Sequence, residues 1–294
     1  MLKKKSKITP LDIIILVLFF GVIAYIVKQI TFELNYKWKW HVIPQYLFRY
    51  DSETGRWVPN YLMQGLFTTL RLSFWGTILA TIFGTVMGLC RVSRSLLCRM
   101  IGRSYVELMR NLPPLIIIFI FYYFLSDQIM PIIGIDNFLR SSSPEIKQFF
   151  ELLFAPPQYA SAFISALFTL AVFEGAYITE IVRAGIQSVE KGQWEATHVL
   201  GLSKLHAMRY IILPQAIQRV LPPLAGQFIS LIKDSAIVSV ISIQELSFQG
   251  KQLMASTYLT IEIWITVSLL YLVMTLTCSL GVGKLEVYMA RSRA

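Results

Sequence analysis

Six apolar stretches, each close to 20 residues or longer, recur along this sequence of 294 residues. A helix of about 20 residues spans the hydrocarbon core of a bilayer. One such stretch could be a buried helix of a soluble protein, but six in one chain exclude that explanation. Only 15% of the residues are charged, against about 25% in soluble domains. The sequence therefore predicts an all-α membrane protein with six transmembrane helices. The stretches lie near residues 11–27, 62–90, 112–131, 158–182, 217–245 and 259–282.

Basic residues give the chain a formal net charge of +10, and they gather in short segments between the apolar stretches. Lys and Arg are enriched in the cytoplasmic loops of membrane proteins, so this clustering indicates orientation in a lipid bilayer rather than a nucleic acid partner. It predicts that both termini lie in the cytoplasm. The slightly basic segment 31–60 is the exception, and we interpret it as an external loop with interfacial aromatic residues. No small-x-small cleavage site follows residues 11–27, so we expect a retained first helix.

One stripe of small residues marks the second apolar stretch: Gly76, Ala80, Gly84 and Gly88 recur at a spacing of four. Small residues on one helix face let a second helix approach closely, which favours association where apolar burial does not drive it. The stripe predicts a packed bundle and says nothing about function.

A cytoplasmic segment, residues 183–214, has the pattern of two short helices joined by a tight turn. Good helix formers run from Gln193 to Leu200, with Leu200 expected on the same face as Trp194 and Thr197. Gly201 fits a helix C-terminus in the left-handed conformation. Ser203 can cap a second helix, and Pro214 is expected where the chain re-enters the membrane.

This segment resembles the EAA loop of ATP-binding-cassette (ABC) importer permeases. Its flanks resemble those of polar amino acid permeases of the histidine, glutamine and glutamate type. The resemblance covers about residues 61–290, and Thr197 and Glu174 depart from its usual residues. It rests on Glu195-Ala196-Thr197, on Gly201 six residues after Glu195, on Leu213-Pro214, and on the flanking runs 105–115, 177–189, 215–224 and 232–241.

The resemblance implies a five-helix type I importer core in residues 61–290, preceded by an extra helix and loop in residues 1–60. It implies residence in a bacterial inner membrane. The partners would be an ABC ATPase dimer, a second permease chain (the same or a sister chain) and an extracytoplasmic binding protein that delivers an amino acid. The contact with the ATPase would be made by Glu195, Ala196, Thr197, Gly201, Leu202, Leu213 and Pro214.

Charged and polar residues within the apolar stretches are candidates for the substrate path: Glu174, Tyr177, Lys233 and Asp234. A charge at the centre of a membrane helix costs about 2.5–3.5 kcal/mol, so such residues usually face a cavity or a partner. We expect Glu174, Tyr177 and Asp234 to meet the ammonium group of the substrate. The alternative is a structural role, in ion pairs with Glu107, Arg110 or Glu180. A local pair between Glu180 and Arg183 is also expected from their spacing.

The chain contains no phosphate-binding motif of the form G-x-x-x-x-G-K-[ST], so we expect it to bind no ATP and to need a partner for energy. We expect no enzymatic activity, no cofactor and no metal site in this chain, because its histidines and cysteines show no ligand-like clustering. The alternative function is a secondary transporter driven by an ion gradient, a class that usually shows repeated halves with broken helices.

Overall fold

The computed structural model of the chain describes residues 10–32, 36–53 and 55–291. The chain divides into two compact units, residues 1–40 and 41–294. The first unit contains one long helix, α1 (Pro10–Phe32), whose sequence is strongly apolar. The first expected transmembrane stretch is therefore helical. All elements from α2 onward belong to the second unit.

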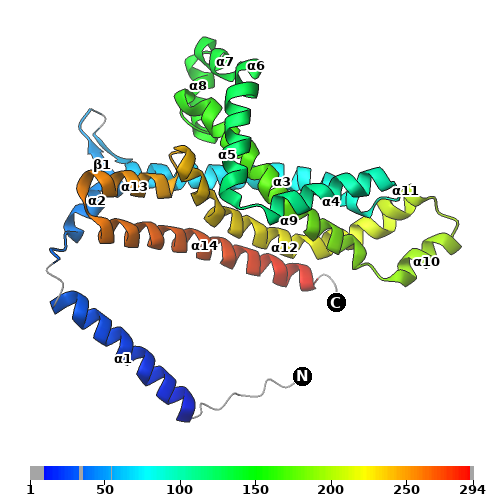
Figure 1. Cartoon of the computed structure of the whole chain (residues 1–294), viewed down its shortest axis with the longest axis horizontal. Helices are drawn as coiled ribbons and strands as arrows, with labels where there is room; N and C mark the ends of the chain where they lie inside the picture. The colour runs from blue at the N-terminus through cyan, green and yellow to red at the C-terminus, as the bar shows by residue number, and fades with distance from the viewer. Residues whose placement is uncertain (1–9, 33–35, 54, 292–294) are drawn as a thin grey trace. The chain divides into compact units, whose positions relative to one another are not determined.

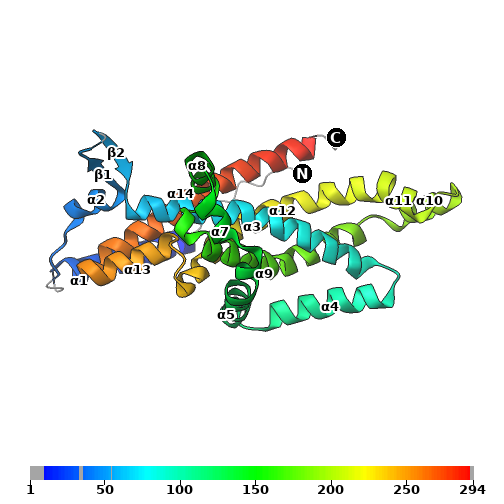
Figure 2. The same cartoon turned by 90° about the horizontal axis from the view of Figure 1, so that it is seen from above.

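Five helical segments of the second unit are long and apolar enough to cross a membrane. Each overlaps one of the stretches expected from the sequence, so the expected fold class is confirmed. In Figures 1 and 2, α3, α9, α12 and α14 follow one general direction, whereas α5 stands across them. The main helices of the segments are α3 (Tyr61–Val92), α5 (Pro114–Phe124), α9 (Ala160–Gln187), α12 (Leu213–Asp234) and α14 (Thr260–Arg291).

The closest helix packing joins α3 to α9 along the stripe of small residues. All four of its members are buried. A Cβ atom built on Gly84 would lie 2.7 Å from Ile178 Cβ and 2.8 Å from the Gly175 carbonyl oxygen, and one on Gly88 would lie 2.7 Å from Val182 Cγ1. Because a larger residue would collide with backbone as well as side chains, the stripe has the packing role predicted for it.

A small β-hairpin follows the first unit, in a segment that the sequence indicated only as a loop. After the 3₁₀ turn η1 (Trp40–Val42) and helix α2 (Ile43–Leu47), strand β1 (Phe48–Asp51) pairs antiparallel with β2 (Arg56–Pro59). The Asn60 N–H donates to the Leu47 carbonyl oxygen at 2.8 Å, which ties the hairpin to the start of α3. The rings of Tyr50 and Trp57 pack edge to face across the hairpin.

Shorter elements connect the long helices. The segment Lys204–Ile241 continues as one helical run, and Pro214 lies inside that run. Pro214 lies in the first turn of α12, where the missing N–H and fixed φ of proline are tolerated. The connecting elements are α4 (Leu96–Asn111), η2 (Leu125–Ile129), α6 (Met130–Ile133), α7 (Ile135–Ser141), α8 (Pro144–Leu153), η3 (Pro157–Tyr159), α10 (Lys191–Val199), α11 (Lys204–Ala207), η4 (Met208–Ile212), η5 (Ser235–Ile241) and α13 (Leu246–Thr257).

Candidate functional site

A helical loop, α10 to α11, projects from one end of the bundle (Figures 1 and 2). Gly201 follows α10 with φ of +64°, which favours glycine. The Leu202 N–H donates to the Thr197 carbonyl oxygen at 3.1 Å, and the Gly201 N–H donates to that of His198 at 3.0 Å. These two bonds form a Schellman motif. The Ser203 hydroxyl then accepts from the His206 N–H as the N-cap of α11, so the predicted turn and cap are confirmed.

The surface of this loop is apolar where the chain turns. Val199 is 88% exposed, Leu200 70% and Leu205 75%. Thr197 is instead buried, and its hydroxyl donates to the Trp194 carbonyl oxygen at 2.7 Å. The expectation that Leu200 shares the inward face of Trp194 and Thr197 is wrong, because the helix ends before Leu200 and the turn points it outward.

The remaining residues of the EAA-like motif lie around the same loop. Glu195 and Ala196 are exposed on α10, and Leu202 is half-buried after the turn. Leu213 and Pro214 begin α12. The loop is joined to the bundle because the Gln215 amide donates to the Gln193 side-chain oxygen at 3.2 Å, and the Arg219 guanidinium donates to the Ser188 carbonyl oxygen.

A second feature is a cavity of about 400 Å³ between α9, α12 and the start of α5, which we call the charged cavity. Three of the four predicted substrate-path residues line it: Tyr177, Lys233 and Asp234. Pockets of 300–1,000 Å³ with a few convergent polar groups are typical of small-ligand sites. The full lining is Pro114, Phe173, Tyr177, Gln227, Ser230, Lys233, Asp234 and Ile237.

Glu174, the fourth predicted residue, is fully buried behind the lining of the charged cavity rather than part of it. The Gln227 amide donates to its carboxylate, and its other oxygen has no hydrogen-bond partner among the described residues. The Glu174 carboxylate also repels the Asp234 carboxylate electrostatically. Two carboxyl groups this close repel each other, so a cation or a proton between them is favoured.

The ion-pair partners considered for these charges are engaged elsewhere. Glu107 pairs with Arg103 at 2.7 Å. Glu180 pairs with Arg183 at 2.7 Å, as predicted, and also with Arg91 of α3 at 2.9 Å. Glu107 and Glu180 are therefore not the partners of the cavity charges.

Arg110 does not line the charged cavity, and it contacts a residue that does. Its guanidinium carbon is 5.4 Å from the centroid of the Tyr177 ring, which is within cation–π range. The cation thus lies next to a predicted substrate-path residue.

Gln227 is the residue that sequence reasoning missed. It is uncharged, so it escaped a search for charges in apolar stretches. It lies seven residues before Asp234, which places both side chains on one face of α12. A search for polar residues at helical spacing from Asp234 would have found both Gln227 and Ser230.

A metal site finds no support among the described residues, where no group of three or more His, Cys, Asp or Glu side chains could hold an ion. His198 and His206 are exposed on the α10–α11 loop, and the His206 ring lies 2.7 Å from the Ser203 hydroxyl.

Comparison with solved structures supports the fold. The chain aligns with the structure described as "Crystal structure of an amino acid ABC transporter with histidines", with a TM-score of 0.62 and 32% identity over 78% of this chain and 94% of that one. An inward-facing structure of the MetNI methionine ABC transporter aligns with a TM-score of 0.58 over 78% of this chain and 96% of that one. Because the identity is only 16%, the second match supports the fold alone.

Comparison with known sequences gives the family. The chain is 33% identical to the "Probable glutamine ABC transporter permease protein GlnM" of Bacillus subtilis, over 78% of this chain and 94% of that protein. It is 31% identical to the glutamine transport system permease protein GlnP of Escherichia coli, over 76% and 91% respectively. These matches support the importer interpretation over an ion-gradient-driven transporter.

The family profile described as "Binding-protein-dependent transport system inner membrane component" matches residues 80–286. That range contains the projecting loop, the charged cavity and four of the five long apolar helices of the second unit. The chain belongs to the family of inner membrane components of binding-protein-dependent transport systems.

Proposed function

We propose that this chain is the permease subunit of an ABC importer and that it carries a polar amino acid across a bacterial inner membrane. The α10–α11 loop carries the proposal, because a rigid projection with exposed apolar side chains is suited to docking in a groove of another protein. The partner would be an ABC ATPase dimer that hydrolyses ATP in place of this chain. Glu195, Ala196, Thr197, Gly201, Leu202, Leu213 and Pro214 form the coupling region.

The proposal includes the rest of the assembly. Two permease chains, identical or sister chains, would stand side by side, and an extracytoplasmic binding protein would deliver the amino acid. The loop and both termini would then lie in the cytoplasm, in agreement with the positive-inside rule. We assign transport to residues 61–290, and we assign no cofactor to this chain.

Gly201→Ala tests the coupling role. An alanine at φ of +64° costs about 1–2 kcal/mol, which lowers the equilibrium constant for forming the turn about 5–30-fold. We expect a several-fold loss of amino acid uptake and of ATP hydrolysis stimulated by the binding protein, in proteoliposomes holding the whole assembly. Gly192→Ala is the matched control, because Gly192 lies in α10 at helical φ with open space around it. Equal activity of the two variants would contradict the proposal.

The charged cavity is the proposed translocation site, where Asp234 and Glu174 would meet the substrate ammonium and Tyr177 and Lys233 would line the path. The mutually repelling carboxyls support this role, since a cation between them relieves the repulsion.

Asp234→Asn and Glu174→Gln test this assignment. We expect both to weaken amino acid affinity at least ten-fold, at equal levels of assembled protein in the membrane. Asp136→Asn, at an exposed position of α7, is the control and should leave uptake unchanged. If both variants transport with unchanged affinity, the carboxyls have a structural role instead.

A further inference from the structure

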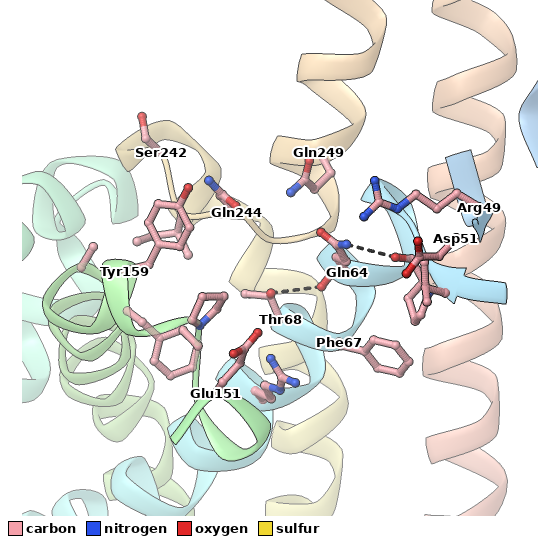
Figure 3. Close-up of a pocket in the computed structure, with 18 residues that line it drawn as sticks. Arg49, Asp51, Gln64, Phe67, Thr68, Glu151, Tyr159, Ser242, Gln244 and Gln249 are labelled. Carbon is pink, nitrogen blue, oxygen red and sulfur yellow. Dashed lines mark hydrogen bonds between the residues drawn. The ribbon is translucent and has the colours of Figure 1, made fainter. Parts of the chain in front are cut away.

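A second cavity, of about 420 Å³, lies at the end of the bundle opposite the α10–α11 loop. We call it the hairpin cavity, because the β-hairpin forms one wall. The other walls are the first turns of α3, the end of α8, the start of α9 and the segment between η5 and α13 (Figure 3). It shares no lining residue with the charged cavity. Its hairpin and α3 walls precede residue 80, where the family match begins.

Arg71 is the central feature of the hairpin cavity. It lies half-buried in the third turn of α3, a mostly apolar helix whose other charged residue, Arg91, lies in its last turn. No described residue forms an ion pair with it within 4.0 Å. Arginine in a membrane-spanning helix is costly and is usually retained for a function. Its planar guanidinium presents paired donors that match a carboxylate, so Arg71 gives the cavity a group suited to binding a carboxylate.

Glu151 supplies a negative charge on the same cavity. It is exposed near the end of α8. Its carboxylate attracts the Arg71 guanidinium electrostatically, although the two form no close ion pair. The end of α8 is held against α3, because the Trp75 indole N–H donates to the Leu153 carbonyl oxygen at 2.9 Å and the Trp75 ring stacks on Phe154 at 5.1 Å. The two opposite charges therefore line one cavity from two elements that these contacts hold together.

Amide side chains are also part of the polar lining, together with Arg49, Asp51, Thr68, Tyr159 and Ser242. Gln64, Gln244 and Gln249 all contribute to the wall. The Gln64 amide donates to the Pro59 carbonyl oxygen at 3.0 Å, which links the hairpin to α3 (Figure 3). Among the described residues, neither Gln244 nor Gln249 has a hydrogen-bond partner for its side chain, so both amides are available to a ligand. An amide both donates and accepts, which suits an uncharged polar group.

We propose that the hairpin cavity binds a free amino acid as a zwitterion. Arg71 holds its carboxylate, Glu151 faces its ammonium group, and Gln244 and Gln249 contact an uncharged polar side chain. The cavity is thus a second amino acid site, distinct from the charged cavity and built largely from the part of the chain that precedes the family match. The inference rests on the proposed function in one respect, because it takes the cargo to be an amino acid.

The test is the binding of radiolabelled L-glutamine to the complete permease–ATPase assembly in nanodiscs, without the binding protein. We expect two sites per permease chain. Arg71→Gln and Glu151→Gln should each weaken one site at least ten-fold, and Asp234→Asn should weaken the other. Arg140→Gln, an exposed arginine of α7, is the matched control. Competition by N-acetyl-L-glutamine or L-glutaminamide, which each lack one charge, should be at least ten-fold weaker at the site lost in Arg71→Gln.

Two further results keep the inference apart from the proposed function. If Arg71→Gln fails to assemble, Arg71→Lys keeps the charge without the paired donors, and Glu151→Gln alters an exposed residue. Unchanged glutamine binding in Arg71→Gln, Arg71→Lys and Glu151→Gln would overturn the second site. It would not affect the proposed function, because uptake would still occur. Loss of uptake driven by the binding protein with glutamine binding unchanged would also overturn the second site, because the cavity would then contact the binding protein. Failure of the proposed function would appear as no uptake by the wild-type assembly.

Discussion

Glu245 shows how one residue can join three helices. Its carboxylate caps α13 by accepting from the Ser247 N–H at 2.9 Å and the Phe248 N–H at 2.7 Å. It also accepts from the Tyr271 hydroxyl of α14 at 2.8 Å and contacts the Thr69 hydroxyl of α3 at 3.5 Å. The side chain is fully buried. A buried carboxylate with this many donors is a structural junction, and it lies outside the five long apolar segments.

The stability of this junction is expected to depend on pH. Burial raises the pKa of Glu245 to about 7, against an ordinary value of 4.5, although its hydrogen bonds oppose the shift. A carboxyl with a raised pKa contributes its full stability below about pH 4.5, and that contribution is lost as the pH rises through about 7. The loss is on the order of 3 kcal/mol.

Thermal unfolding of the purified permease should show this dependence. We expect the melting temperature of the wild type to fall between pH 4.5 and 7 by more than that of Glu245→Gln, which cannot ionise. Glu190→Gln, at the exposed start of α10, is the control and should follow the wild type. Parallel pH profiles for the wild type and Glu245→Gln would contradict the assignment.

At the scale of elements, the sequence predicted the features that depend on the length of an apolar stretch or on the backbone preference of one residue. Each expected stretch became a helix, and Gly201 took the left-handed conformation that its position predicted. Orientation after a helix end was less predictable, because Leu200 faces outward once α10 has ended. The hairpin was also missed, because one of the bonds that hold it joins the Asn60 amide to the Gln45 carbonyl oxygen 15 residues earlier, which no local pattern reveals.

Contacts between residues far apart in the sequence also limited the prediction of the candidate site. Intramembrane charges can be found in a sequence because they are costly in an apolar helix. Which of them reaches a cavity depends on packing between α9 and α12, so Glu174 was found while its position behind Gln227 was not. Arg71 lies within an expected apolar stretch, but its site depends on a hairpin and on α8, which are far away in the sequence.

At the scale of the whole molecule, two helices connect the projecting loop to the charged cavity. The loop follows the end of α9 and leads into α12, and the cavity lies between those same helices. Arg91 of α3 and Arg183 both pair with Glu180 near the loop end of α9. The same two helices thus run from the loop to the cavity, which is the connection that the proposed coupling to a motor at the loop would use.

The first unit is expected to be dispensable for this coupling. It forms a compact unit of its own, and 78% of the chain already aligns with 94% of the Bacillus subtilis relative. We expect replacement of α1 by an unrelated apolar helix of equal length, with its flanking lysines kept to preserve orientation, to leave uptake within about two-fold of wild type. The measurement is amino acid uptake in proteoliposomes at matched protein levels, with Gly201→Ala as the variant that should lose activity. Loss of uptake in a correctly inserted α1 replacement would contradict this expectation, because the side chains of α1 would then take part in transport.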